Sequence, residues 1–196
     1  MAKYFDKSIL TLLTKDSKAI VKIRNRVLKE TSIDILDTDA ISSLFIYEIV
    51  SQYDNDYNIN FARNGEDAKS KDILIEQKAT RVKGPYTKTG KLRKNVGVDA
   101  SFQFHAMGDL DYPRYIFAVR DVDDLSIRRI YDIGNKDNKQ VVLNHLLHER
   151  ELWLERSKLD KRHMKRDIII LPEKFILENC NLTNKLSINN CQVFKD

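Results

Sequence analysis

The sequence has few cysteines and no long apolar run. Its two cysteines, Cys180 and Cys191, have no further Cys or His at the spacing of a metal site. We therefore expect two reduced thiols, and neither a disulfide nor a zinc site. No run approaches the roughly 18 apolar residues of a membrane-spanning helix. Residues 1–18 also lack the apolar stretch and cleavage site of a signal peptide. These absences predict a cytoplasmic protein without membrane contact.

Internal repeats and low-complexity segments are also lacking. The apolar share of 42% and the charged share of 32% are ordinary for a globular protein. A length of 196 residues is sufficient for one domain with its own core. We expect a single domain over 1–196 in three parts. These are a helical N-terminal part (1–55), a part with a hairpin, a basic loop and a sheet (56–133), and a helix, a strand and a C-terminal segment (134–196).

Positive charge is concentrated in one segment. The formal net charge of +5 is a mild bias, but residues 78–94 carry seven basic and no acidic side chains. The dipeptides Gly-Pro and Thr-Gly interrupt this run, which predicts an extended loop. Such a loop is either a solvated surface or an arm that contacts phosphates, because a polyanion relieves the repulsion among its charges. The predicted DNA-binding residues are Arg81, Lys83, Tyr86, Lys88, Lys91, Arg93 and Lys94.

The spacing of apolar residues predicts helices at the start of the chain and strands in its middle. The predicted helices are 16–30, 37–53, 98–109 and 138–161. The predicted strands are 72–79, 114–121, 125–133 and 166–171. Asn64-Gly65 predicts a hairpin turn, since both residues can adopt positive φ. This order predicts an α/β (α+β) fold, with a central mixed sheet flanked by helices.

The strand 72–79 carries polar residues that could perform chemistry. Glu76 and Lys78 lie two positions apart and therefore on one face, and Asp67 precedes the strand. Two carboxylates offer the hard oxygens that Mg²⁺ prefers, and Mg²⁺ activates water for phosphodiester hydrolysis. Lys78 could orient or deprotonate that water and offset negative charge. The backbone carbonyl of Gln77 is a further expected metal ligand. The alternative is a solvated ion pair on an exposed edge strand.

These residues resemble a known family. "GED" followed by "ILIEQK" is similar to the motif of the PD-(D/E)XK nuclease superfamily, which includes many type II restriction endonucleases. The resemblance covers about residues 40–133 by element order, and the motif itself about a dozen residues. It implies a restriction-endonuclease-like core with Asp67 as first acid, Glu76 as second acid and Lys78 as the lysine. Glu66 replaces the usual proline, so Glu66 is the alternative first acid. Asp67 is favoured because a small residue follows it at the exit of the hairpin.

The resemblance also implies a further metal ligand and a function. Many members carry an acidic residue on a helix before the core, which implies Glu48 as a ligand; pairing with a buried Arg or a place at the helix edge is the alternative. The implied activity is that of an Mg²⁺-dependent type II restriction endonuclease, which cleaves double-stranded DNA at a specific sequence. A homodimer is expected, because a two-fold pair of sites suits a palindromic duplex. The alternatives are a junction resolvase or repair nuclease with the same core, and a non-catalytic DNA-binding protein.

Overall fold

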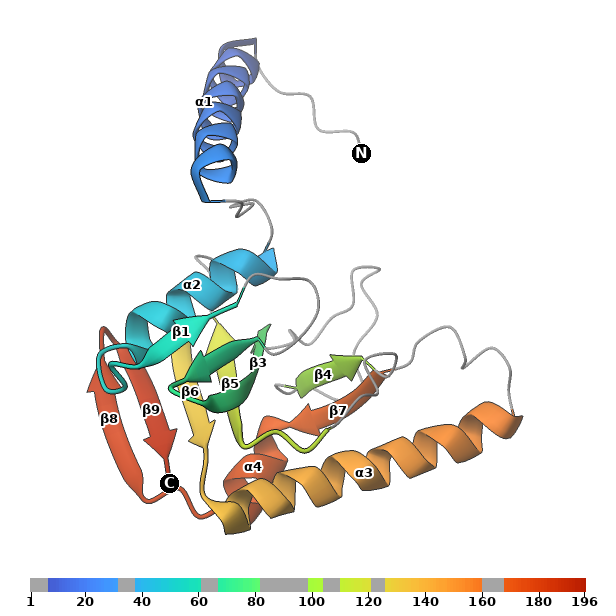
Figure 1. Cartoon of the computed structure of the whole chain (residues 1–196). Coiled ribbons are helices and arrows are strands. Elements are labelled where there is room, and N and C mark those ends of the chain that lie inside the picture. Colours follow the sequence, from blue (N-terminus) through green and yellow to red (C-terminus); the bar gives the residue numbers. More distant parts are fainter. Residues whose placement is uncertain are drawn as a thin grey trace. The chain divides into compact units, whose positions relative to one another are not determined.

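The structure is a computed structural model, and the chain divides into two compact units, Met1–Ile41 and Ser42–Asp196. It describes residues 7–31, 38–60, 67–81, 99–103, 110–120, 126–159 and 168–196 (Figure 1). Within these ranges, no helix combines the length and the apolar character needed to cross a membrane. The expectation of one domain in three parts stays a prediction.

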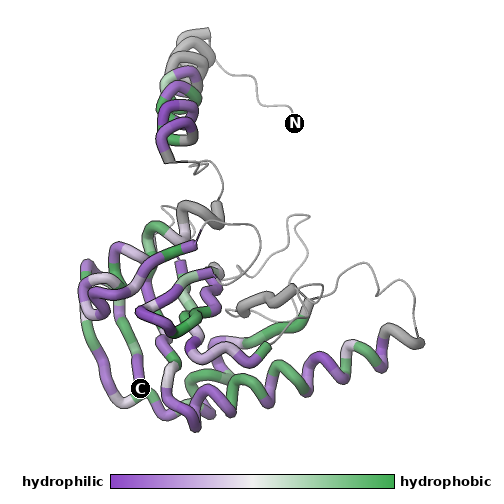
Figure 2. Tube along the Cα trace, viewed as in Figure 1, coloured by the Kyte–Doolittle hydropathy of each residue, from purple (hydrophilic) through white to green (hydrophobic). Residues whose placement is uncertain are grey.

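Helix α1 (Lys7–Thr31) belongs to the first unit. The predicted helix 16–30 is therefore confirmed, although α1 begins nine residues earlier. Hydrophobic and hydrophilic residues alternate in bands along it (Figure 2). Apolar side chains of this helix are half exposed: the exposed fractions of Ile20, Val21 and Ile23 are 48%, 48% and 52%. The spacing of apolar residues identifies the apolar face of a helix but not what covers it.

The second unit is built on a mixed seven-stranded sheet. Its strand order is β1-β2-β3-β5-β6-β9-β8. The bounds are β1 (Tyr57–Ile59), β2 (Ala68–Ser70), β3 (Ile73–Arg81), β5 (Arg114–Arg120), β6 (Ile127–Ile133), β8 (Asn184–Ile188) and β9 (Cys191–Lys195). The pairs β3–β5 and β6–β9 are parallel, and the other neighbours are antiparallel. The α+β fold with a mixed sheet is therefore confirmed.

Helix α2 (Thr38–Val50) covers one face of this sheet, where Ile46 and Ile49 pack with Ile75 of β3. The other face is covered by α3 (Lys136–Leu159), α4 (Glu173–Asn179) and a small sheet of β4 (Asp99–Gln103) and β7 (Ile168–Pro172). Its core contains Tyr115 and Phe117 of β5. Strand β5 is thus buried on both faces, as expected of a central strand.

One predicted element is wrong. Residues 99–103, expected within a short helix over 98–109, form strand β4, which pairs antiparallel with β7. The segment is too short for its apolar spacing to separate helix from strand, and β7 supplies the hydrogen-bonding partner that decides the conformation. Residues 104–109 of the expected helix lie outside the described ranges. Helix α2 also ends at Val50, three residues before the predicted end.

Candidate active site

The site lies where β2 stops covering the edge of β3. Ala68, the first residue of β2, is opposite Ile75, so the following residues of β3 have no partner in β2. Asp67 occupies this edge with its side chain: its Oδ2 accepts a hydrogen bond of 3.0 Å from the backbone N–H of Gln77. The end of the hairpin thereby places the first acid beside the middle of β3.

The three predicted catalytic side chains meet at this edge. Lys78 Nζ lies 3.1 Å from Asp67 Oδ2, and the same nitrogen forms an ion pair with Glu76 Oε1. Two carboxylates are therefore within reach of one cation. Glu76 is only 8% exposed, so the alternative of a solvated pair on an exposed edge is wrong. Glu76 and Lys78 lie opposite Tyr115 and Phe117 of β5 and share their face of the sheet.

Burial and charge act against each other on these groups. Burial raises the pKa of the Glu76 carboxyl, and the positive charge of Lys78 opposes this rise without cancelling it. Burial alone would lower the pKa of Lys78, but the charges of Glu76 and Asp67 outweigh it and raise that pKa. Lys78 is therefore an ammonium group at neutral pH. In this arrangement it can orient water or offset negative charge, but it does not remove a proton.

Gln77 is fixed from the opposite face of the sheet. The residue is 7% exposed. Its Oε1 accepts a hydrogen bond from Tyr57 O–H, and its Nε2 donates to Ser43 Oγ at 2.8 Å. The N–H and C=O of one strand residue point to the same edge. The carbonyl of Gln77 is therefore directed to the edge that holds Asp67, where a metal ligand was predicted.

Tyr112 joins the cluster and was missed from the sequence. Its side chain forms a hydrogen bond with Glu76, and burial, followed by the charge of Glu76, raises the pKa of Tyr112 to about 12. Tyr112 lies two residues before β5, and β5 pairs with β3. Only this pairing register brings Tyr112 to Glu76, so no local signal in the sequence indicates its role.

The other predicted site residues do not join the cluster in the described ranges. Glu48 is exposed on α2, and α2 packs on the face of the sheet opposite to that of Glu76. The structure therefore does not bring Glu48 to the site. Arg81 ends β3, opposite Arg120 of β5, and its side chain is not described. The remaining predictions, Glu66, Lys83, Tyr86, Lys88, Lys91, Arg93 and Lys94, lie outside the described residues.

The donor set of the cluster fits Mg²⁺. Asp67 and Glu76 supply hard carboxylate oxygens, and the Gln77 carbonyl supplies a third. Mg²⁺ is usually held by one or two carboxylates, and waters and substrate phosphates complete its shell. Within the part of the chain that the structure describes, no group of three His, Cys, Asp or Glu side chains could hold a metal ion. These described residues therefore do not form a metal site from protein side chains alone.

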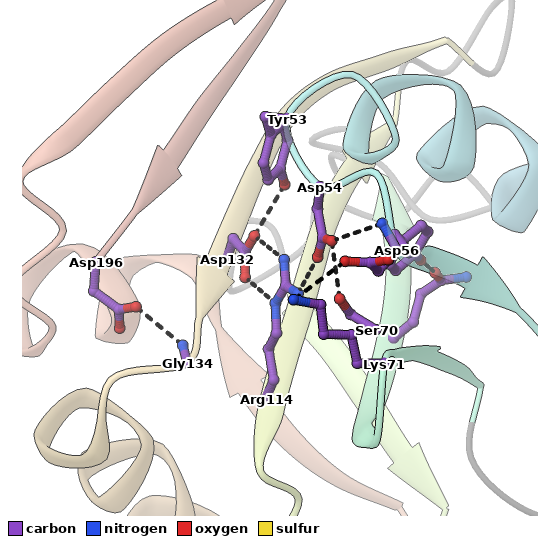
Figure 3. Close-up of polar contacts among 11 residues, drawn as sticks. Tyr53, Asp54, Asp56, Ser70, Lys71, Arg114, Asp132, Gly134 and Asp196 are labelled. Atoms are coloured by element: carbon purple, nitrogen blue, oxygen red, sulfur yellow. Dashed lines mark hydrogen bonds and ion pairs between the residues drawn. The ribbon is translucent and has the colours of Figure 1, made fainter.

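A second polar cluster ties the turn after α2 to the sheet (Figure 3). Arg114 donates from Nε and Nη2 to the two oxygens of Asp132, at 2.7 and 2.6 Å, and also pairs with Asp54. Tyr53 O–H donates to Asp132 at 3.0 Å. An open pocket of about 240 Å³ lies here, lined by Tyr53, Asp54, Arg114, Asp132, Gly134, Lys195 and Asp196. Arg114 and its carboxylates satisfy one another, which indicates a structural role.

Comparison with known proteins adds no relative to these observations. No family model and no curated protein matches the chain. The functional interpretation therefore depends on the geometry of Asp67, Glu76 and Lys78.

Proposed function

We propose that this chain is an Mg²⁺-dependent endonuclease that hydrolyses phosphodiester bonds of double-stranded DNA. One observation carries the proposal: Lys78 Nζ contacts oxygens of both Asp67 and Glu76. Two acidic side chains that share the ammonium group of one lysine form a site suited to a metal ion and a phosphate.

Each residue has a defined task in this proposal. Mg²⁺ would neutralise charge and lower the pKa of the attacking water. Asp67, Glu76 and the carbonyl of Gln77 would hold the ion. The Lys78 ammonium would stabilise the negative charge that develops on the phosphate. Tyr112 keeps the Glu76 carboxylate oriented through its hydrogen bond.

The finer proposal is a cytoplasmic type II restriction endonuclease of the PD-(D/E)XK kind, with a restriction-endonuclease-like core, that acts as a homodimer. Two features support it. The order of elements is a helix, a hairpin strand preceded by the first acid, and a longer strand with the Glu-x-Lys pattern. That longer strand, β3, lies beside the buried strand β5 in a mixed sheet.

The test combines metal binding with DNA cleavage. Mn²⁺ binding is measured by calorimetry on the protein alone, and plasmid cleavage is followed with Mg²⁺. Glu76→Gln and Lys78→Ala should each reduce cleavage by several orders of magnitude while duplex binding persists. Glu48→Gln is the matched control, because Glu48 is exposed on α2, and it should cleave normally. Near-normal cleavage by either site variant would remove the proposed site.

The cleavage products separate the remaining alternatives. Fixed fragments from a plasmid would support restriction at a specific sequence. Cleavage of branched DNA alone would indicate a junction resolvase. Duplex binding that Mg²⁺ does not change, without cleavage, would indicate a non-catalytic DNA-binding protein.

A further inference from the structure

The formal charge of helix α1 equals that of the whole chain. The sequence has 34 basic and 29 acidic residues, and α1 alone has seven of the first and two of the second. Its formal charge is therefore +5, and basic and acidic residues balance in the rest of the chain. This 25-residue helix is therefore, beside residues 78–94, a second concentration of positive charge that attracts polyanions.

The basic side chains of α1 are aligned on one face. Lys18, Lys22, Arg26 and Lys29 recur at intervals of four, four and three residues, which places them in one row along the helix. All four are exposed, and the side chain of Arg26 is 75% exposed. Arg26 Nε also lies 4.0 Å from an oxygen of Glu30. The row is therefore open to solvent along its length.

The two acidic residues of α1 are Asp16 and Glu30. Asp16 and Glu30 fall in register with Ile20, Ile23 and Val27, at successive spacings of four, three, four and three residues. Glu30 follows Arg26 by four residues and pairs with it at 4.0 Å, so an acidic side chain adjoins the row of Lys18, Lys22, Arg26 and Lys29 only at its end. Like charges four residues apart destabilise an isolated helix, so this segregation is unfavourable unless an anion approaches the basic face.

The dimensions of the row suit a nucleic-acid backbone. From Lys18 to Lys29 the helix advances eleven residues, or about 16 Å at roughly 1.5 Å per residue. One strand of duplex DNA presents a phosphate about every 3.4 Å along its axis. Four cations in this length therefore meet several phosphates, each within reach of a flexible side chain.

An anionic membrane is the competing partner of a basic amphipathic helix. Insertion of the apolar side of α1 would carry Asp16 and Glu30 toward the acyl chains and anionic headgroups, which is unfavourable for both carboxylates. The helix also has no aromatic residue, and aromatic residues are common on helices that lie in membrane interfaces. These two observations favour nucleic acid.

We propose that the face of α1 formed by Lys18, Lys22, Arg26 and Lys29 binds the phosphate backbone of duplex DNA. This inference rests on the proposed function only in the choice of DNA as the polyanion. The face grips any duplex without reading its sequence, because contacts to phosphates carry no information about bases.

The test measures how duplex binding depends on salt, without divalent cations so that no cleavage occurs. The four basic residues are replaced by Gln, which has nearly the same helix propensity as Lys and Arg. The control variant removes the same charge from exposed lysines of the second unit, with Gln at Lys69, Lys136, Lys174 and Lys185. Binding to a random duplex is followed by fluorescence anisotropy between about 50 and 200 mM salt. Circular dichroism checks that both variants keep their helices.

We expect the α1 variant to lose up to about 3.6 from the slope of log affinity against log salt, since each phosphate contact contributes about 0.9. The control variant should lose less than one contact's share. Equal slopes in the two variants would overturn the proposal. So would a parent protein that binds vesicles of anionic lipid through α1 but does not bind duplex DNA.

The outcome is separable from that of the proposed function. If the parent protein binds no Mn²⁺ but the α1 variant has a lower slope, this inference stands and the proposed nuclease activity is refuted. If the parent cleaves DNA but the α1 variant has an unchanged slope, the nuclease activity stands and this inference is refuted.

Discussion

Replacing Lys78 by Met tests whether two carboxylates really share its ammonium group. The exposed fractions of the Lys78, Glu76 and Asp67 side chains are 27%, 10% and 37%. Removing one partner from a fully buried ion pair costs about 3–5 kcal/mol, and from an exposed pair about 0–1 kcal/mol. For this half-buried group we expect the free energy of unfolding to fall by about 2–3 kcal/mol when no metal is present.

The loss should grow with pH. Burial raises the pKa of Glu76, and Lys78 opposes that rise, so the pKa rises further once Lys78 is absent. When the pKa of a carboxyl is higher in the folded than in the unfolded protein, the folded protein loses stability as the pH rises through the folded pKa. The difference between the variant and the parent should therefore be larger at roughly pH 8 than at roughly pH 5.

Divalent cations should raise the stability of the variant to about that of the parent without metal. An ion at 100 times its dissociation constant stabilises the folded protein by about 2.7 kcal/mol, which is close to the expected deficit. The assay is urea unfolding at both pH values, with Mg²⁺ or with a chelator. Lys69→Met is the matched control, since Lys69 is exposed on β2, and it should change neither the stability nor its dependence on Mg²⁺. Without metal, parent-like stability of the Lys78 variant at the higher pH would refute the shared site. So would a variant whose stability Mg²⁺ does not raise.

Three further predictions concern other parts of the second unit. Gln77→Leu removes two side-chain hydrogen bonds behind the site and should slow plasmid cleavage by about 10–100-fold with duplex binding retained, as a small displacement of reacting groups does. Arg114→Met leaves buried Asp132 without its partner and should lower the free energy of unfolding, measured in urea, by about 3–5 kcal/mol; Asp132→Asn in the same chain should recover part of this loss. Burial raises the thiol pKa of Cys180 and of Cys191 from 9.0 to about 11, so both should react with a disulfide reagent about 100-fold more slowly near pH 7.5 than after unfolding.

Local patterns in the sequence predicted the elements whose conformation depends little on neighbouring elements. The apolar spacing of α2 and α3 and the continuous apolar run of β5 identify them without any knowledge of neighbours. The same holds for the alternation in β3, which places Glu76 and Lys78 on one face. The part of the site that lies on β3 and on the hairpin before it could therefore be predicted from the sequence.

Features that depend on distant pairing could not be predicted in this way. Tyr112 reaches Glu76 only because β5 lies beside β3 in one particular register. Strand β4 is a strand because β7 pairs with it from far along the chain. The hairpin of β8 and β9 was overlooked although its turn has a signal: Asn189 and Asn190 both adopt positive φ, at 48° and 63°, and Asn is suited to such turns.

The parallel pairing of β6 with β9 has a consequence for the order of folding. The hairpins of β1–β2–β3, β5–β6 and β8–β9 join neighbouring parts of the chain, whereas β6 meets β9 where Ile130 pairs with Val193. Closing such a long loop costs more entropy and is slower than forming a hairpin. While a ribosome still holds residues 184–195, the β6 edge that later meets β9 is unpaired. An unpaired edge is a template for pairing with another chain. The nascent protein is therefore prone to aggregation until the hairpin of β8 and β9 pairs with β6.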